Sequence, residues 1–116
     1  MMKLYGIPNC DTVKKARTWL ANQQIAVEFH DFKKQGLTAE TVQRWLQQST
    51  WEQLINRKGM TWRGLSDEQK TISDNAAAQQ LMLDKTSVIK RPLLEQSGKL
   101  LHIGFDEAAY TKTFNL

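Results

Sequence analysis

The chain has 116 residues, of which 41% are hydrophobic, and it carries a net charge of +4 and a single cysteine. This length suits one globular domain with its own core, and we expect a single domain over residues 1–116. One cysteine excludes an internal disulfide framework, and no apolar run approaches the ~20 residues of a membrane helix. No secretory leader is recognisable either, so we expect the protein in the cytoplasm. We also expect it to be a monomer.

Composition also limits the partners. With one cysteine and two distant histidines, His30 and His102, we expect no metal site. The positive charges are dispersed and form no run of five or more, so a nucleic-acid partner is not expected. The net charge therefore fits either a solvated surface or a small anionic partner.

The first third of the chain predicts a strand, a helix and a second strand. Residues 2–7 form a short apolar run, residues 11 to about 22 place apolar side chains at helical spacing, and residues 25–32 alternate. A βαβ unit of this length has parallel strands and a right-handed crossover.

The middle third predicts short helices. They begin near residues 37, 50, 66 and 74, and the second and third start with capping-box sequences, Thr50–Gln53 and Ser66–Gln69. Residues 56–65 form a basic loop with two glycines.

The last third predicts a strand over residues 87–95 that is interrupted by Pro92, a turn at 96–98, a strand over 99–104 and a helix capped by Asp106. The full order is β-α-β, a helical block, then β-β-α, which indicates an α/β fold.

Cys10 follows the first strand and opens the first helix. Backbone N–H groups and the helix dipole at such a position favour a thiolate, which is a nucleophile. A buried structural cysteine is the alternative, but the polar run Pro8–Thr12 favours a functional one. We expect Thr12 to donate a hydroxyl hydrogen bond to the sulfur and Lys14 to offset Asp11, which either raises the thiol pKa or caps the first turn.

Arg91-Pro92 is the second notable feature. Proline inside a strand is confined to edges and bulges, and either a cis peptide bond or an edge position explains it. A guanidinium at Arg91 is suited to stabilising a thiolate or to binding an oxyanion. The basic loop offers further cations for such a site, or merely solvated side chains; these are Arg57, Lys58 and Arg63.

These features resemble the arsenate reductase (ArsC)/Spx family, and within it the small bacterial YffB-type proteins. Four runs carry the resemblance: residues 4–16, 54–58, 89–93 and 104–107. The resemblance implies a thioredoxin/glutaredoxin-like fold with a mixed four-stranded sheet and an inserted helical block.

It also implies roles for individual residues. Cys10 is the nucleophile, Arg91 stabilises the thiolate or binds an oxyanion, and Pro92 faces the cysteine with a cis peptide bond. Arg57 matches a second basic residue of the arsenate reductase pocket. We therefore expect Cys10 and Arg91 to be catalytic, and we expect the substrate to be bound by Arg57, Lys14, Thr12, Asn9 and Pro92.

Two positions depart from the family pattern. Val13 stands where Spx-type members have a second cysteine, and Ile103 stands where arsenate reductases have a third arginine. We therefore predict a glutathione-dependent monothiol reductase that acts on a disulfide or a glutathionylated substrate. It has no tightly bound cofactor, glutathione is its co-substrate, and glutaredoxin is a further partner.

Two alternatives remain. One is an arsenate reductase that uses glutathione or glutaredoxin. The other is a non-enzymatic, Spx-like regulator that binds RNA polymerase, which the missing second cysteine disfavours because it removes the redox switch.

Overall fold

The computed structural model describes residues 1–116 and divides into two compact units. Unit 1 consists of Met1–Gly36 together with Arg91–Leu116, and unit 2 is the segment Leu37–Lys90 between them. The helical block predicted from the sequence corresponds to unit 2. Whether the two units behave as one domain stays a prediction.

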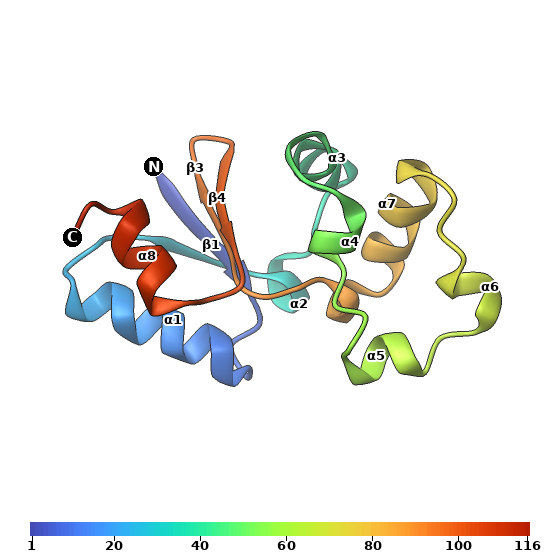
Figure 1. The fold of residues 1–116 in the computed structure, drawn as a ribbon, viewed down its shortest axis with the longest axis horizontal. Helices are drawn as coiled ribbons and strands as arrows, with labels where there is room; N and C mark the ends of the chain where they lie inside the picture. The colour runs from blue at the N-terminus through green and yellow to red at the C-terminus, as the bar shows by residue number, and fades with distance from the viewer. The chain divides into compact units, whose positions relative to one another are not determined.

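Unit 1 is built around a mixed four-stranded sheet (Figure 1). Its strands lie in the order β2-β1-β3-β4; β1 and β2 are parallel, and the other neighbours are antiparallel. This confirms the predicted thioredoxin-like α/β fold and its parallel βαβ unit. The elements of unit 1 are β1 (Met2–Gly6), α1 (Asp11–Asn22), β2 (Glu28–Asp31), α2 (Phe32–Gln35), β3 (Leu93–Gln96), β4 (Lys99–Ile103) and α8 (Glu107–Thr113).

The core of unit 1 joins the two central strands to α1 and α8. Leu4 of β1 lies opposite Leu94 of β3, and both pack with Ala16, Leu20 and Tyr110. All five are at most 1% exposed. Each fully buried leucine contributes about 2 kcal/mol of hydrophobic stabilisation. This packing anchors the helix that begins at the cysteine.

Unit 2 consists of short helices that begin with polar caps. Side chains at the N-cap positions accept a hydrogen bond from the backbone N–H three residues on in α3, α4, α6 and α7. The helices of unit 2 are α3 (Ala39–Gln48), α4 (Trp51–Leu54), α5 (Met60–Arg63), α6 (Asp67–Lys70), α7 (Asn75–Asp84) and the 3₁₀ turn η1 (Thr86–Val88).

The two predicted capping boxes differ in outcome. The one at Ser66 is complete, since Ser66 and Gln69 satisfy each other's backbone N–H groups. At Thr50 only half forms, because the Gln53 side chain accepts a hydrogen bond from the Ser49 hydroxyl instead, at 2.6 Å.

Two predicted strands are shorter than expected. The strand over 25–32 is reduced to Glu28–Asp31. At its end the Asp31 carboxylate accepts from the N–H groups of Lys33 and Lys34 and starts α2, and before it the Ile25 N–H bonds the Leu20 carbonyl of α1. The strand over 87–95 begins only at Leu93. Before it the chain forms η1 and makes a single β-bridge, between Ile55 and Ile89. The basic loop contains a further short helix, α5, that the sequence did not predict.

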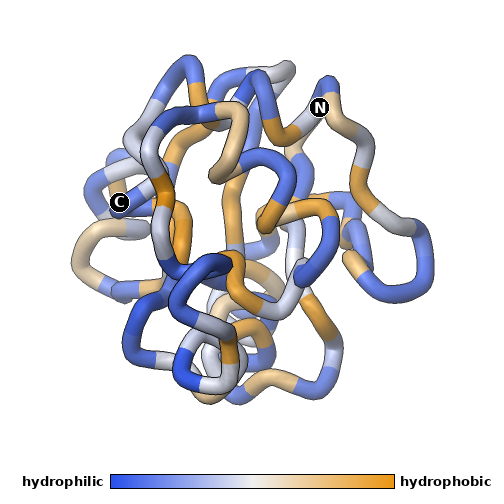
Figure 2. Tube along the Cα trace, turned by 90° about the vertical axis from the view of Figure 1, so that its right-hand side faces the viewer, coloured by the Kyte–Doolittle hydropathy of each residue, from blue (hydrophilic) through white to orange (hydrophobic).

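Figure 2 shows short apolar stretches alternating with hydrophilic ones along the chain. None of the helices has the length and apolar character needed to cross a membrane.

Candidate active site

Cys10 is the N-cap residue of α1. Its backbone is extended (φ −144°, ψ 122°), and its carbonyl accepts the first helical hydrogen bond, from the Lys14 N–H at 2.9 Å. Asp11 is therefore the first residue inside the helix, and the expectation that it caps the first turn is wrong. Asp11 is exposed to solvent, and the partly buried sulfur occupies the place of a capping oxygen.

The surroundings of Cys10 shift its thiol toward the anion. Burial alone would raise the pKa of the Cys10 thiol. The backbone N–H of Val13, the Arg91 guanidinium and the backbone N–H of Thr12 outweigh it, and the net pKa lies below the ordinary value of 9.0. The Cys10 side chain does not form a conventional side-chain cap, so these N–H groups act on the sulfur through the pKa of its thiol.

The donors to the sulfur differ from those expected. Thr12 acts through its backbone N–H rather than its hydroxyl, and Val13 supplies a second N–H. The sequence marked Val13 only as the place of an absent cysteine. An available signal was its position three residues after the N-cap, where the backbone N–H ordinarily bonds the capping side chain.

Arg91-Pro92 lies beside Cys10. The guanidinium of Arg91 both hydrogen-bonds to the sulfur and attracts its negative charge. The Arg91-Pro92 peptide bond is cis, as the resemblance implied, and Pro92 is buried. The Pro92 carbonyl accepts from the Gly104 N–H at 2.8 Å, which fastens this segment to the end of β4.

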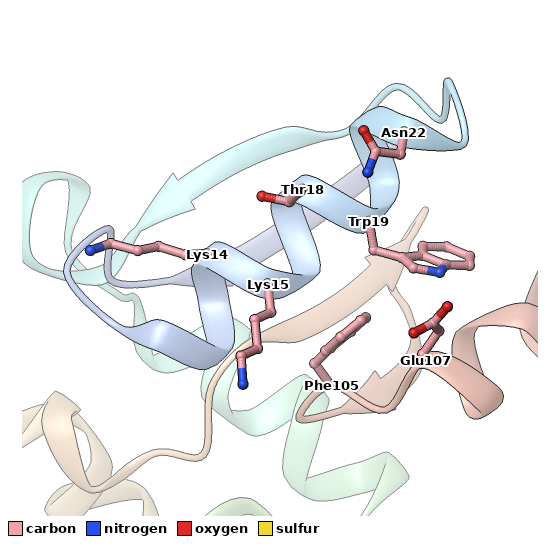
Figure 3. A pocket seen from close by; sticks show the side chains of 7 residues that line it. All are labelled: Lys14, Lys15, Thr18, Trp19, Asn22, Phe105 and Glu107. Carbon is pink, nitrogen blue, oxygen red and sulfur yellow. The ribbon is translucent and has the colours of Figure 1, made fainter.

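The other expected site residues are less closely engaged. Asn9 is exposed in the turn before Cys10, and Lys14 is exposed one helical turn after it. Figure 3 shows the Lys14 side chain pointing away from Phe105 and Glu107. Arg57 belongs to unit 2, where its guanidinium lies 5.3 Å from the centre of the Trp51 ring. Roles for these three in substrate binding stay predictions.

A metal centre has no donor set in the structure. No group of three or more histidine, cysteine, aspartate or glutamate side chains is arranged to hold a metal ion. What unit 1 presents is one cysteine with a lowered pKa beside an arginine, on a thioredoxin-like fold.

This combination defines a class, the thioredoxin-like proteins with a thiol at the start of the first helix. Within this class the chain belongs to the ArsC family, whose model matches residues 5–113.

Two solved structures are similar over nearly the whole chain. The YFFB protein is 44% identical and has a TM-score of 0.91, covering 97% of this chain and 98% of its own. An arsenate reductase (ArsC) related protein from Brucella melitensis is 50% identical with a TM-score of 0.79, covering 99% and 95%.

The curated relatives include a regulator. An uncharacterised protein of Haemophilus influenzae is 40% identical over 98% of this chain and 99% of its own length. The global transcriptional regulator Spx of Lactiplantibacillus plantarum is 27% identical over 92% and 81%. The proteins similar to this chain therefore include one named as arsenate reductase related and one named as a transcriptional regulator.

Proposed function

We propose that this protein is a monothiol reductase that uses the Cys10 thiolate to reduce a disulfide or a glutathionylated substrate. The observation that carries the proposal is the partly buried Cys10 sulfur with a lowered pKa, held beside the Arg91 guanidinium. A thiolate attacks a disulfide sulfur, whereas the protonated thiol does not.

The chemistry runs in two exchanges. The Cys10 thiolate attacks the glutathione sulfur of a mixed disulfide; a new S–S bond forms, the old one breaks, and the substrate sulfur leaves as a thiolate that takes up a proton. A second glutathione, as its thiolate, then attacks the glutathione sulfur held on Cys10. This releases oxidised glutathione and regenerates the Cys10 thiolate. The substrate sulfur is reduced from the disulfide to the thiol level, the incoming glutathione sulfur is oxidised from the thiol to the disulfide level, and the first glutathione stays at the disulfide level throughout.

Glutathione is the resolving thiol in this proposal because the chain offers no second thiol. Cys10 is the sole cysteine of the sequence. Glutaredoxin is the alternative resolving partner. In either case Arg91 stabilises the attacking thiolate and the thiolate that leaves Cys10 in the second exchange.

The test is a coupled assay with bis(2-hydroxyethyl) disulfide, glutathione, glutathione reductase and NADPH. Cys10→Ser should lose all turnover above the uncatalysed rate, because a hydroxyl is not ionised at neutral pH. Lys99→Gln is the control, since it changes an exposed residue of β4 that belongs to no candidate site. Full activity in Cys10→Ser contradicts the proposal.

Arsenate reduction is a second candidate, and the 50% identity to the Brucella protein favours it. Ile103, an apolar residue at the end of β4, stands where the resemblance predicts a third arginine for the oxyanion. Replacing the disulfide by arsenate in the same assay, with glutaredoxin added, decides between the substrates. Oxidation of NADPH that depends on both arsenate and Cys10 assigns arsenate.

Transcriptional regulation is a third candidate, favoured by the Spx relatives. It predicts a stable complex with the RNA polymerase α subunit and no dependence on turnover. A pull-down that stays empty at high protein concentration, alongside a turnover-competent preparation, excludes it.

A further inference from the structure

Unit 1 contains a groove between α1 and the turn that leads into α8. The groove has a volume of about 460 Å³. Its floor is aromatic, with Trp19 on α1 and Phe105 before α8, and its rims are charged, with Lys15 on one side and Glu107 on the other. Figure 3 shows the Phe105 ring lying between Lys15 and Glu107, with the Trp19 ring opposite.

The aromatic floor is held in place from below. The Tyr110 ring, fully buried, makes edge-to-face contacts with both floor residues. Ring centres lie 5.5 Å apart for Trp19 and 4.8 Å apart for Phe105. Such contacts fix the two rings before any ligand arrives, which lowers the entropy that binding costs. The groove is therefore a preformed feature of the core packing.

Both walls of the groove are connected by backbone hydrogen bonds to residues of the candidate active site. The first wall is α1 itself, whose first hydrogen bond runs from the Lys14 N–H to the Cys10 carbonyl. The second wall begins at Phe105, directly after Gly104, whose N–H bonds the Pro92 carbonyl. The near end of the groove, at Lys14, is thus one helical turn of α1 from Cys10, although Cys10 does not itself line the groove.

The length of the groove points to a polypeptide. Its lining on α1 runs from Lys14 to Asn22, a distance of about 12 Å at the ordinary helical rise. An extended peptide covers this distance with about four residues. Glutathione has one residue on either side of its cysteine, so with its sulfur at Cys10 it reaches only the near end.

The charged residues of the groove determine which substrate side chains are favoured at each position along it. Lys14 and Lys15 lie on the first turns of α1, near the thiol, and both are exposed. Glu107 faces the aromatic floor from the opposite rim. Since the Lys14 side chain points away from Phe105 and Glu107, an acidic side chain is favoured next to Lys15, an apolar one over the rings, and an acidic one is disfavoured beside Glu107.

We propose that this groove binds an extended segment of a protein substrate, the residues that flank its target sulfur, with an acidic side chain at Lys15 and an apolar one on Trp19 and Phe105. This inference rests on the proposed reductase function and specifies the substrate class as polypeptide. Arsenate and low-molecular-weight disulfides do not need the groove.

The experiment compares two glutathionylated peptides that differ at one position beside the cysteine, Asp in one and Lys in the other, each followed by Leu. We expect kcat/KM to be about fivefold higher for the Asp peptide, the size that a partly exposed ion pair supports. Lys15→Glu should invert this ratio. Lys99→Glu, an equal charge change on an exposed residue of β4, should preserve it.

A binding measurement separates this inference from the reductase proposal. The Asp peptide with Ser in place of its cysteine is titrated into the isotope-labelled protein, and the Trp19 indole and Phe105 signals should shift. Shifts without turnover of any disulfide keep the groove and end the reductase proposal. Turnover of bis(2-hydroxyethyl) disulfide with equal rates for both peptides and no shifts overturns the groove. So does a rise in KM for glutathione in Lys15→Glu, because it assigns the groove to glutathione.

Discussion

The helices α1 of unit 1 and α5 of unit 2 begin without a side-chain cap, whereas α2 and α8 of unit 1 and the remaining α-helices of unit 2 begin with one. In unit 2, α3, α4, α6 and α7 each begin with a hydroxyl or carboxylate that caps a backbone N–H; these caps are Thr38, Thr50, Ser66 and Asp74. In unit 1, α1 begins at Cys10, a residue type outside the usual set of caps. The N–H groups that a cap normally satisfies act on the sulfur instead. The start of α1 therefore differs from the capped helices in that its first N–H groups lower the pKa of a thiol instead of bonding a capping oxygen.

The units also differ in how their elements are joined. Unit 1 is held by strand pairings between residues about 90 positions apart, such as Tyr5 with Leu93. Unit 2 has no strand pairing beyond one isolated bridge, and its short helices pack on buried apolar side chains such as Trp45 of α3 and Met82 of α7. Disturbing the packing of β1 against α1 should therefore reach Cys10 directly, whereas a cap lost in unit 2 should act on stability alone.

The largest effect is expected from Gly6→Ala. A Cβ at Gly6 would lie 2.9 Å from Val13 Cγ2, closer than real contacts allow, and Val13 is fully buried. Overpacking of this kind costs about 1–3 kcal/mol of unfolding free energy. Because the Val13 N–H acts on the sulfur, the pKa of Cys10 should rise as well. Urea unfolding followed by circular dichroism, and the pH dependence of alkylation by iodoacetamide, measure the two effects.

The control is a glycine of unit 2. A Cβ at Gly64 meets only backbone oxygens at 3.6 and 3.7 Å, which is ordinary contact, and the residue has a helical φ of −82°. Gly64→Ala should be neutral or stabilising by about 0.5 kcal/mol. Equal losses from both substitutions would show that Gly6 is no more constrained than Gly64.

A smaller effect is expected from exchanging the caps. Asp74→Ala removes the carboxylate that accepts from the Ala77 N–H at 2.8 Å and should cost about 1 kcal/mol. Cys10→Ser does the opposite, since it places a good capping residue at the start of α1. At acidic pH, where the thiol is protonated, Cys10→Ser should be at least as stable as the wild type. Thermal unfolding at pH 5 compares the two variants, and a marked loss in Cys10→Ser contradicts the view that α1 is poorly capped.

Local signals in the sequence were sufficient for most of these elements. The apolar spacing of α1, the helix starts at Ser66 and Asp74, and the apolar run of β1 need only neighbouring residues, and each is confirmed. The first residues of the strands, Glu28 and Leu93, depend on competition between strand pairing and a local turn, which short-range patterns do not resolve.

At the site, Cys10 and Arg91 were identified from the sequence. The donation by Val13 and Thr12 was not, because it depends on which residue becomes the N-cap. The groove was missed since its aromatic floor combines residues more than 80 positions apart, Trp19 and Phe105.

The smallest expected difference between the two units is the pH dependence of their contribution to stability. The pKa of Cys10 in the folded protein lies below its ordinary value of 9.0. At a pH between the folded and the unfolded pKa, the native state therefore binds fewer protons than the unfolded chain. The contribution of the thiolate to stability is therefore complete above the unfolded pKa and is lost as the pH falls through the folded one.

Arg91→Gln removes the guanidinium that lowers the pKa of Cys10, and both the alkylation profile and this part of the stability curve should move toward higher pH. The side chain is only partly buried, so we expect the change in stability to be small and the change in the alkylation profile to be the clear one. Arg63→Gln in unit 2 should leave both profiles where they are, and a profile that Arg91→Gln does not move would mean that the backbone N–H groups alone hold the thiolate.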